Sequence, residues 1–347
     1  MKIMKKLLFK KHTSYRSLPV NLKQEDLILF KRELEREIPN SYLVNIKKAI
    51  YLNQSLYKYS GFLQFSKYTN FGKLKITDRL KDIIKYILTS GSPIELETCI
   101  WVLDNKSHVY GHFLNDTMCR LIMIPEEYRS GYKILIPENL NLEWIIDIFV
   151  FFDIEYEILE QNKKYLIYNL LTTTFPARPG NFNKEILMQF KKESVNRLGE
   201  EINNFQSEKT PMKRIWIDRG ASRRNVYNME EIKPILDKYN FHIIDFKNFS
   251  ISEKIKIMND VEILAGNHGS GLANMTFMNE KANILDIRDP NDLYKNAFFS
   301  QASDLNLNYF YMERETSDPG SDVLFDDVRI NPQKLNSVIN EIINYSD

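Results

Sequence analysis

The pattern of apolar and polar positions changes about 90 residues into the chain. Before that point, residues 24–38 and 78–88 carry apolar side chains three and four positions apart, which predicts helices, and no repeating strand pattern is visible. From residue 97 onward, short apolar runs alternate with longer amphipathic segments. These predict strands at 98–103, 132–136 and 165–168, with helices at 110–124 and 142–151 between them. Such alternation is typical of a parallel sheet covered on both faces.

A break in this pattern separates two halves of the chain. Residues 172–183 (TTTFPARPGNFN) contain two prolines, a glycine and three threonines, which indicates a linker. Beyond it the alternation returns, with helices expected at 184–204, 229–239, 252–259, 272–278 and near 332–343, and strands at 213–218, 241–246, 261–265 and 283–287. We therefore predict an α/β protein with two Rossmann-like domains facing across a cleft, at residues 1–172 and 184–330, followed by a C-terminal helix at 331–347.

Composition and charge narrow the range of functions. The 347 residues are 43% hydrophobic and 27% charged, which indicates an ordinary globular protein. The net charge of +1 provides no overall field that would recruit nucleic acid, so no nucleic-acid partner is expected. Cys99 and Cys119 are too few for a disulfide framework or a four-thiolate zinc site, and a reducing, cytoplasmic location is the default. No apolar run approaches the ~20 residues of a membrane-spanning helix.

The first 24 residues are basic and contain no acidic residue. Their seven positive side chains are Lys2, Lys5, Lys6, Lys10, Lys11, Arg16 and Lys23. Because apolar residues lie between the first of these lysines, this arm could attach weakly to an anionic membrane surface. The alternative is a solvated, frayed terminus.

A glycine-rich segment follows the predicted strand 261–265. It reads GNHGSG from Gly266 to Gly271, and a helix is expected after it, so free backbone N–H groups and the positive end of that helix would converge. The glycine spacing fits neither the dinucleotide-binding motif nor a Walker loop. His268, inside the segment, can donate to a diphosphate oxygen. The alternative is that these glycines only form a tight turn.

Three arginines follow the neighbouring predicted strand 213–218. Arg219, Arg223 and Arg224 carry guanidinium groups, which bind phosphate oxygens in a bidentate manner. Arginines in a loop are often only a solvated surface. However, if this strand and the strand before the glycine-rich segment are adjacent, both loops lie at one edge of the sheet. We then expect a shared diphosphate ligand.

A third segment lies in the first half of the chain. His108, His112 and Asp116 are spaced four residues apart, so a helix that begins near His108 would place all three on one face. His112 could then act as a general base oriented by Asp116. The alternative is a structural hydrogen bond between the two side chains.

Together these segments resemble a known family. Residues 108–121 (HVYGHFLNDTMCRL), 218–232 (DRGASRRNVYNMEEI) and 265–277 (AGNHGSGLANMTF) are similar, in the right order, to three signature segments of glycosyltransferase family 61, which includes capsular polysaccharide biosynthesis proteins. The resemblance covers about residues 95–330. It implies a GT-B type, inverting glycosyltransferase that uses a nucleotide diphosphate sugar, commonly a UDP-sugar. Domain 1–172 would then bind the acceptor and domain 184–330 the donor.

The resemblance implies a role for each candidate residue. His112 and Asp116 would be catalytic. The donor would be bound by Arg219, Arg223, Arg224, Asn228, Glu230, His268, Gly269, Ser270, Gly271 and Asn274. The chain departs from the family pattern at Met229, where a Glu is usual, and Glu230 could replace that Glu from the next position.

Cofactors, partners and location follow from the same reading. No metal or other cofactor is expected, because a strict Asp-x-Asp motif is absent, although Asp286 and Asp289 near a strand end leave a metal conceivable. The expected partners are a UDP-sugar and a glycan or lipid-linked acceptor, used in the cytoplasm or at the inner face of the plasma membrane. The alternative is a catalytically silent homologue that serves as a scaffold for another transferase. A methyltransferase on a Rossmann fold is disfavoured by the repeated α/β pattern and by the glycine spacing.

Overall fold

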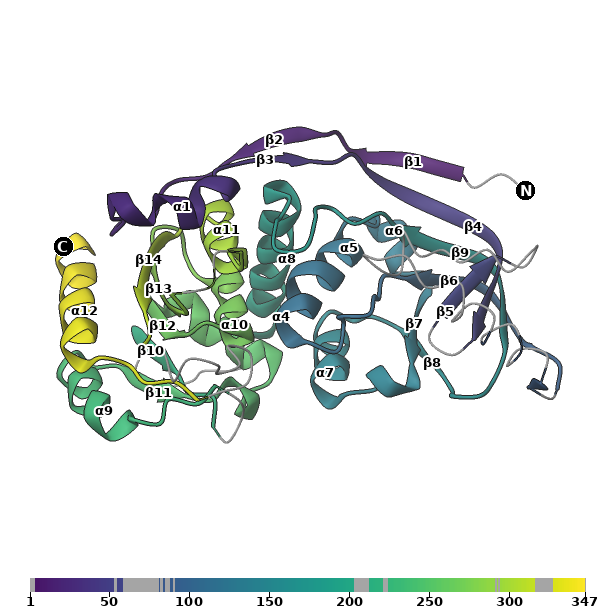
Figure 1. The fold of residues 1–347 in the computed structure, drawn as a ribbon. Coiled ribbons are helices and arrows are strands. Elements are labelled where there is room, and N and C mark those ends of the chain that lie inside the picture. Colours follow the sequence, from purple (N-terminus) through teal and green to yellow (C-terminus); the bar gives the residue numbers. More distant parts are fainter. Residues whose placement is uncertain are drawn as a thin grey trace. The chain divides into compact units, whose positions relative to one another are not determined.

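The computed structural model describes residues 4–52, 55–58, 81, 84, 88–89, 91–202, 212–220, 224–290, 292, 294–315 and 327–346. The chain forms two compact units (Figure 1). Unit 1 comprises Met1–His12 and Glu37–Pro179, and unit 2 comprises Thr13–Arg36 and Gly180–Asp347. The division between Pro179 and Gly180 lies inside the segment that the sequence indicates as a linker. The first predicted domain, 1–172, is wrong in one respect, because residues 13–36 belong to unit 2.

Unit 1 contains a seven-stranded mixed sheet. Its strands are β1 (Met4–Phe9), β4 (Ser41–Leu52), β5 (Ser55–Lys58), β6 (Ile94–Trp101), β7 (Lys133–Pro137), β8 (Tyr156–Leu159) and β9 (Tyr165–Thr173), in the order β1-β4-β9-β6-β7-β8 with β5 on β4. The pairs β9–β6 and β6–β7 are parallel, as predicted. The pair β7–β8 is parallel too, but the sequence pattern did not indicate β8. The pairs formed by β4 are antiparallel, which the sequence pattern did not indicate.

Helices link the parallel strands of unit 1. They are α4 (Tyr110–His112), a π-helical turn (Phe113–Met118), α5 (Cys119–Ile122), α6 (Glu126–Arg129) and α7 (Glu143–Phe151), with a 3₁₀ turn at Glu138–Leu140. The helices expected at 110–124 and 142–151 are therefore confirmed, apart from the π-helical turn in the first of them.

The first 90 residues depart most from the expected pattern. Instead of one helix over 24–38, the chain forms a 3₁₀ turn (Gln24–Asp26), the short helix α1 (Leu27–Phe30), a second 3₁₀ turn (Lys31–Glu33) and β3 (Glu35–Ile38), which pairs with β2 (His12–Tyr15). Phe30 explains the difference, because its fully buried ring packs against Phe299, Tyr309 and Tyr311 of unit 2. Tertiary packing thus overrides the local helical periodicity. The helix expected at 78–88 lies largely outside the described residues.

Unit 2 contains a five-stranded sheet in which every pair is parallel. Its strands are β10 (Arg214–Ile217), β11 (His242–Ile244), β12 (Ile263–Asn267), β13 (Asn283–Arg288) and β14 (Asn308–Glu313), in the order β11-β10-β12-β13-β14. The sequence pattern indicated the first four of these strands. It missed β14 and the helix before it, α11 (Ala297–Asp304).

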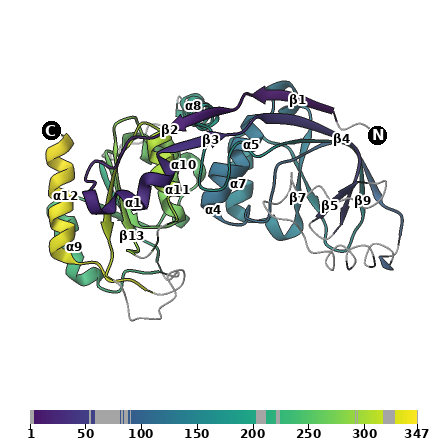
Figure 2. The same ribbon diagram turned by 45° about the horizontal axis from the view of Figure 1, so that its top comes forward.

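Helices cover both faces of this sheet (Figure 1, Figure 2). On one face, α9 (Met229–Lys238) and α12 (Pro332–Ser346) bury Leu236 and Ile339 against strand residues that include Trp216 and Leu285. On the other face lie α8 (Lys184–Ile202), α10 (Ile251–Asp260), α11 and a 3₁₀ helix (Ser270–Phe277), with a further 3₁₀ turn at Phe246–Asn248. This arrangement confirms an α/β protein whose second half is a Rossmann-like unit.

The basic N-terminal arm is part of the fold. β1 pairs with β4 in unit 1. Arg16 is 7% exposed in unit 2, where its guanidinium donates to the Glu33 carbonyl oxygen at 2.8 Å and pairs with Asp304 at 3.3 Å. The frayed-terminus interpretation is therefore wrong for the described part of the arm. Within the described ranges, no helix is long and apolar enough to cross a membrane.

Candidate functional site

The two predicted anion-binding loops leave the same edge of the unit 2 sheet. β10 and β12 are parallel neighbours, so the chain after each strand starts at the same edge. The loops are bonded to each other: Arg224 Nη1 donates to the His268 carbonyl oxygen at 2.8 Å, and Asn267 Nδ2 donates to the Arg224 carbonyl oxygen at 3.0 Å. Arg223 lies outside the described residues. The structure thus confirms the expected adjacency of the arginine loop and the glycine-rich turn.

The three glycines of this turn have different roles. A β-carbon added to Gly266 would lie 3.0 Å from Ile217 Cβ, and one added to Gly271 would lie 2.8 Å from Ile217 Cγ2. These two glycines therefore allow β10 and the turn to pack closely, which agrees with the alternative that the glycines serve to form a tight turn. At Gly269 the same β-carbon would lie 2.0 Å from Arg219 Nη1 and 3.5 Å from Arg224 Nη2. Gly269 is thus the position where guanidinium groups approach the turn's backbone.

The two arginines create a positive, half-buried region beside Gly269. Burial lowers the pKa of Arg219 to about 10, and the charge of Arg224 lowers it further in the same direction. Burial also lowers the pKa of Arg224, with the charge of Arg314 as a second cause. Both shifts arise because burial and a neighbouring positive charge disfavour the charged guanidinium at this point. An anion at this point would relieve that unfavourable energy.

The turn continues into a 3₁₀ helix, Ser270–Phe277, where an α-helix over 272–278 was expected. Its first internal hydrogen bond is donated by the Leu272 N–H to the Gly269 carbonyl oxygen at 2.9 Å. The N–H groups of Ser270 and Gly271 precede that bond, and such leading N–H groups have no acceptor within a helix. Asn274 is fully buried and donates to the Gly271 carbonyl oxygen at 2.9 Å. Asn274 therefore supports the turn from inside.

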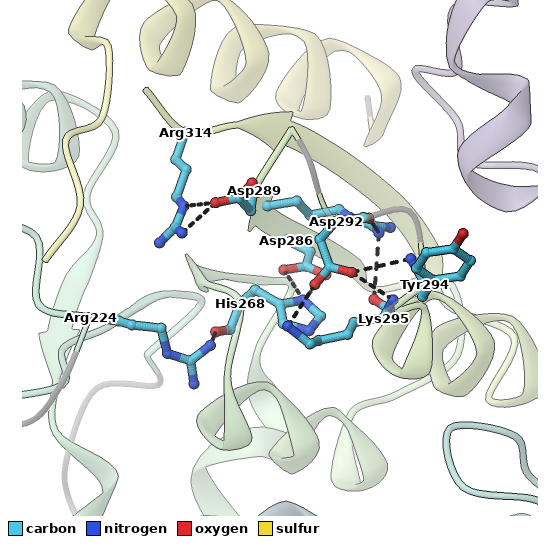
Figure 3. A network of polar contacts seen from close by, with 9 residues as sticks. Arg224, His268, Asp286, Asp289, Asp292, Tyr294, Lys295 and Arg314 are labelled. Carbon is cyan, nitrogen blue, oxygen red and sulfur yellow. Dashed lines mark hydrogen bonds and ion pairs between the residues drawn. The ribbon is translucent and has the colours of Figure 1, made fainter. Parts of the chain in front are cut away.

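His268 is held by a buried carboxylate (Figure 3). Its Nδ1 lies 2.9 Å from Asp286 Oδ2, and Tyr309 Oη donates to the same oxygen at 2.8 Å. Burial by itself raises the pKa of Asp286, but His268, Arg288 and Tyr309 outweigh burial, so that the pKa lies below its usual value. An ionised Asp286 accepts the Nδ1 proton and leaves Nε2 as the ring nitrogen that can contact a ligand.

A small cavity of about 10 Å³ adjoins His268. Its walls are Arg224, Asn267, His268, Arg288, Asp289, Asp292, Lys295 and Arg314. Arg314 donates to Asp289, and Lys295 pairs with Asp292 at 3.0 Å (Figure 3). The sequence did not single out Arg288, Lys295 or Arg314. Their common signal is their place at the edge where the other loops begin, since Arg288 is the last residue of β13, Lys295 follows β13 and Arg314 follows β14, but β14 was not predicted.

Two predicted donor-binding residues do not join this group. Asn228 is 5% exposed, and its amide both donates to the Ile330 carbonyl oxygen at 2.8 Å and accepts from the Ile330 N–H at 3.0 Å. Asn228 therefore has a structural role in connecting α9 to the segment before α12. Glu230 is exposed in the first turn of α9, and Met229 packs against the hydrophobic core.

In unit 1 the predicted His–Asp pair is formed. His112 Nδ1 lies 2.7 Å from Asp116 Oδ2, with the His112 side chain one-third exposed and Asp116 buried. Burial raises the pKa of Asp116, although the hydrogen bond from His112 opposes that shift. The helix begins at Tyr110, so His108 lies before it and is exposed. The condition under which His108 would share this face, a helix that begins near His108, is therefore not met.

Arg120 anchors the helix that carries this pair. Its side chain is fully buried and donates to the Val102 carbonyl oxygen at 2.7 Å and the Thr173 carbonyl oxygen at 2.9 Å. The guanidinium also lies 4.4 Å from the centre of the Phe175 ring. Burial lowers the pKa of Arg120 to about 10, while Asp104 and Asp116 oppose that shift. Arg120 thereby joins the helix to the chain beyond β6 and to the end of β9.

The chain matches the model of a known protein family. The family model described as "Glycosyltransferase 61" matches residues 110–285, which is half of the chain. The matched region begins with the helix of His112 and Asp116 and includes Arg219, Arg224 and His268. No curated protein matches the chain.

Proposed function

Since the chain belongs to the glycosyltransferase 61 family and is therefore a glycosyltransferase, we propose that it is an inverting, metal-independent enzyme that uses a nucleotide diphosphate sugar, with a UDP-sugar as the expected donor. One observation carries the proposal. The side chains of Arg219 and Arg224 approach the backbone of Gly269, and His268 lies in the same turn. The proposal includes a GT-B type arrangement, in which unit 2 supplies the donor-binding groups and unit 1 supplies the base.

The groups in unit 2 suit a departing diphosphate. When the bond to the anomeric carbon breaks, negative charge develops on the phosphate oxygens. Arg219 and Arg224 provide guanidinium donors for those oxygens, and the N–H groups of Ser270 and Gly271 provide a second set. His268 can add a donor through Nε2 when it is protonated, because Asp286 engages Nδ1. Positive charge placed in advance lowers the barrier without further reorganisation.

The His112–Asp116 pair suits the removal of the acceptor proton. Inversion by direct displacement needs one general base for the acceptor hydroxyl. With Nδ1 donating to Asp116, His112 presents Nε2 as the acceptor for that proton, and its side chain is partly exposed. The buried Asp116 would orient the ring and stabilise its charged form. We therefore assign His112 as the base and Asp116 as the orienting carboxylate.

Metal independence is supported by where the carboxylates are engaged. Asp286 is bonded to His268 and Tyr309, and Asp289 is paired with Arg314. These were the two carboxylates that the sequence left as conceivable metal ligands. Guanidinium groups would then supply the positive charge that a divalent cation provides in other transferases.

Donor titration tests the proposal as a whole. The purified full chain is titrated by calorimetry with UDP, GDP, CMP and dTDP sugars, first without added metal and then with EDTA, while slow donor hydrolysis is followed. The proposal expects one donor to bind and to be hydrolysed in EDTA. Absence of binding across the panel would contradict it, and binding without any turnover would favour the silent-homologue alternative.

Replacing the arginine beside Gly269 is expected to weaken donor binding. Arg219→Ala should reduce UDP affinity roughly 10- to 100-fold, since a charged hydrogen bond contributes about 1.5–3 kcal/mol. His268→Ala should reduce it to a smaller extent. Calorimetry with UDP measures both effects. Lys247→Ala, at an exposed lysine of the same unit, is the control and should leave affinity unchanged. Unaltered UDP affinity in Arg219→Ala would contradict the proposal that the diphosphate binds at this turn.

The proposal extends to a glycan or lipid-linked acceptor reached at an anionic membrane surface through the basic arm. Deleting residues 1–20 is expected to lower the melting temperature, because it removes β1 and the buried Arg16. The informative variant replaces Lys5, Lys6, Lys10 and Lys11 by Gln, since these lysines are at least partly exposed. It should keep its melting temperature and lose cosedimentation with anionic vesicles, each lysine contributing about 1 kcal/mol near the surface. Equal sedimentation of variant and wild type would exclude membrane contact through the arm.

A further inference from the structure

The cavity beside His268 carries surplus positive charge. Six charged side chains line it in addition to His268, namely Arg224, Arg288, Lys295, Arg314, Asp289 and Asp292. Each of the two carboxylates already has a basic partner, because Asp289 is bonded to Arg314 and Asp292 to Lys295. Arg224 and Arg288 are thus the two basic side chains in excess of the wall's carboxylates. Asp286 and Asp292 favour the charged form of both arginines, but neither carboxylate forms an ion pair with them among the described residues.

These two arginines also have buried N–H groups that lack an acceptor. Arg288 is 3% exposed, and although its Nη2 donates to the Asp292 carbonyl oxygen at 3.2 Å, its Nη1 has no hydrogen-bond partner among the described residues. The same holds for the Nε of Arg224. Buried N–H groups without an acceptor are unfavourable, and those of charged groups most of all. The cavity wall is thus prepared for an acceptor that is negatively charged.

The size and place of the cavity limit what this acceptor is. About 10 Å³ is close to the volume that one water-sized atom occupies, so a single ligand oxygen fits and a whole phosphate does not. Arg224 lines the cavity and also brings its Nη2 within 3.5 Å of the point where a β-carbon on Gly269 would lie. One guanidinium therefore borders both the cavity and the turn.

We propose that this cavity is a second oxyanion subsite of the donor site, in which Arg288 and Arg224 bind an anionic oxygen of a ligand whose other anionic group lies on the Gly269 turn. The inference rests on the proposed function, because it assigns the turn to a phosphate. Two parts of a sugar nucleotide could supply the second oxyanion. One is the other phosphate of the diphosphate, and the other is the carboxylate of an acidic sugar.

Simple anions test this subsite without knowledge of the nucleobase or sugar. The full chain and Arg288→Met are titrated by calorimetry with inorganic pyrophosphate and with orthophosphate. If the second phosphate occupies the cavity, the wild type binds pyrophosphate more tightly, and Arg288→Met loses about tenfold in pyrophosphate affinity but less than threefold in orthophosphate affinity.

A second pair of ligands distinguishes the carboxylate source. If the sugar carboxylate occupies the cavity, the wild type prefers UDP-glucuronic acid to UDP-glucose about tenfold, and Arg288→Met removes this preference while pyrophosphate affinity stays unchanged. The subsite is overturned if Arg288→Met stays within twofold of the wild type in both comparisons, or if the wild type shows neither pyrophosphate binding nor that preference. Arg288-dependent pyrophosphate binding without binding or hydrolysis of any nucleotide sugar would overturn the proposed function alone.

Two further variants keep the test decisive if Arg288→Met does not fold, since Arg288 also lies over the Phe30 ring at 5.0 Å. Lys295→Met removes a half-exposed cavity lysine and leaves Asp292 without its basic partner. It should lower affinity for the occupying anion at least threefold. Lys247→Met, at an exposed lysine outside the cavity wall, is the matched control. Equal affinities of Lys295→Met and Lys247→Met would overturn the subsite.

Discussion

His112→Ala is expected to lower the rate of sugar transfer by roughly 10²- to 10⁴-fold, the usual contribution of a general base. Donor affinity should stay within about threefold of the wild type, because His112 belongs to unit 1 and the donor-binding groups belong to unit 2. Transfer to acceptor measures the first effect, and calorimetry with the donor measures the second.

Asp116→Asn provides the control for how His112 is oriented. An amide at position 116 can hold the ring but cannot stabilise its positive charge, so transfer should fall strongly while the fold is kept. Near-normal transfer by His112→Ala would contradict the assignment of His112 as the base. Near-normal transfer by Asp116→Asn would contradict the orienting role of the Asp116 carboxylate.

Arg120→Met is expected to destabilise the protein by about 4 kcal/mol, which is a large part of the stability of an ordinary domain. The variant leaves the Val102 and Thr173 carbonyl oxygens buried without their charged donor. It also loses the contact between the guanidinium and the Phe175 ring. Urea unfolding of the full chain measures the change. Because the same helix carries His112 and Asp116, the rate of transfer should fall as well.

Two matched variants distinguish the effect of the Arg120 hydrogen bonds from the effect of its positive charge alone. Arg120→Lys keeps the positive charge, but its ammonium group lacks the planar guanidinium that donates to both carbonyl oxygens. It should therefore lower the free energy of unfolding by about half as much as Arg120→Met. Lys133→Met breaks only an exposed ion pair with Glu157 in the same unit and should change stability by less than about 1 kcal/mol. If Arg120→Met were as mild as Lys133→Met, the anchoring role of Arg120 would be wrong.

Local sequence patterns predicted most of the second half of the fold. In unit 2, four of the five strands and most of the helices follow from apolar runs that alternate with amphipathic segments, because each element buries a face that its own residues define. The spacing of His112 and Asp116 likewise determined their contact, since residues four apart meet on one side of a helix. The sequence placed the arginine loop and the glycine-rich turn after two strands, but that these strands are parallel neighbours is seen only in the structure.

Only the tertiary structure decided the features that join distant parts of the chain. Residues 13–36 joined unit 2 because Phe30 and Arg16 found buried partners there, overriding a helical periodicity. Neighbouring strands place His268 beside Asp286 and place Arg288 in the cavity wall. The side chain of Asn228 is hydrogen-bonded to the backbone of Ile330 instead. Periodicity reports which side of an element is buried. Which side chains meet across elements depends on strand order and packing, and no local pattern in the sequence encodes those.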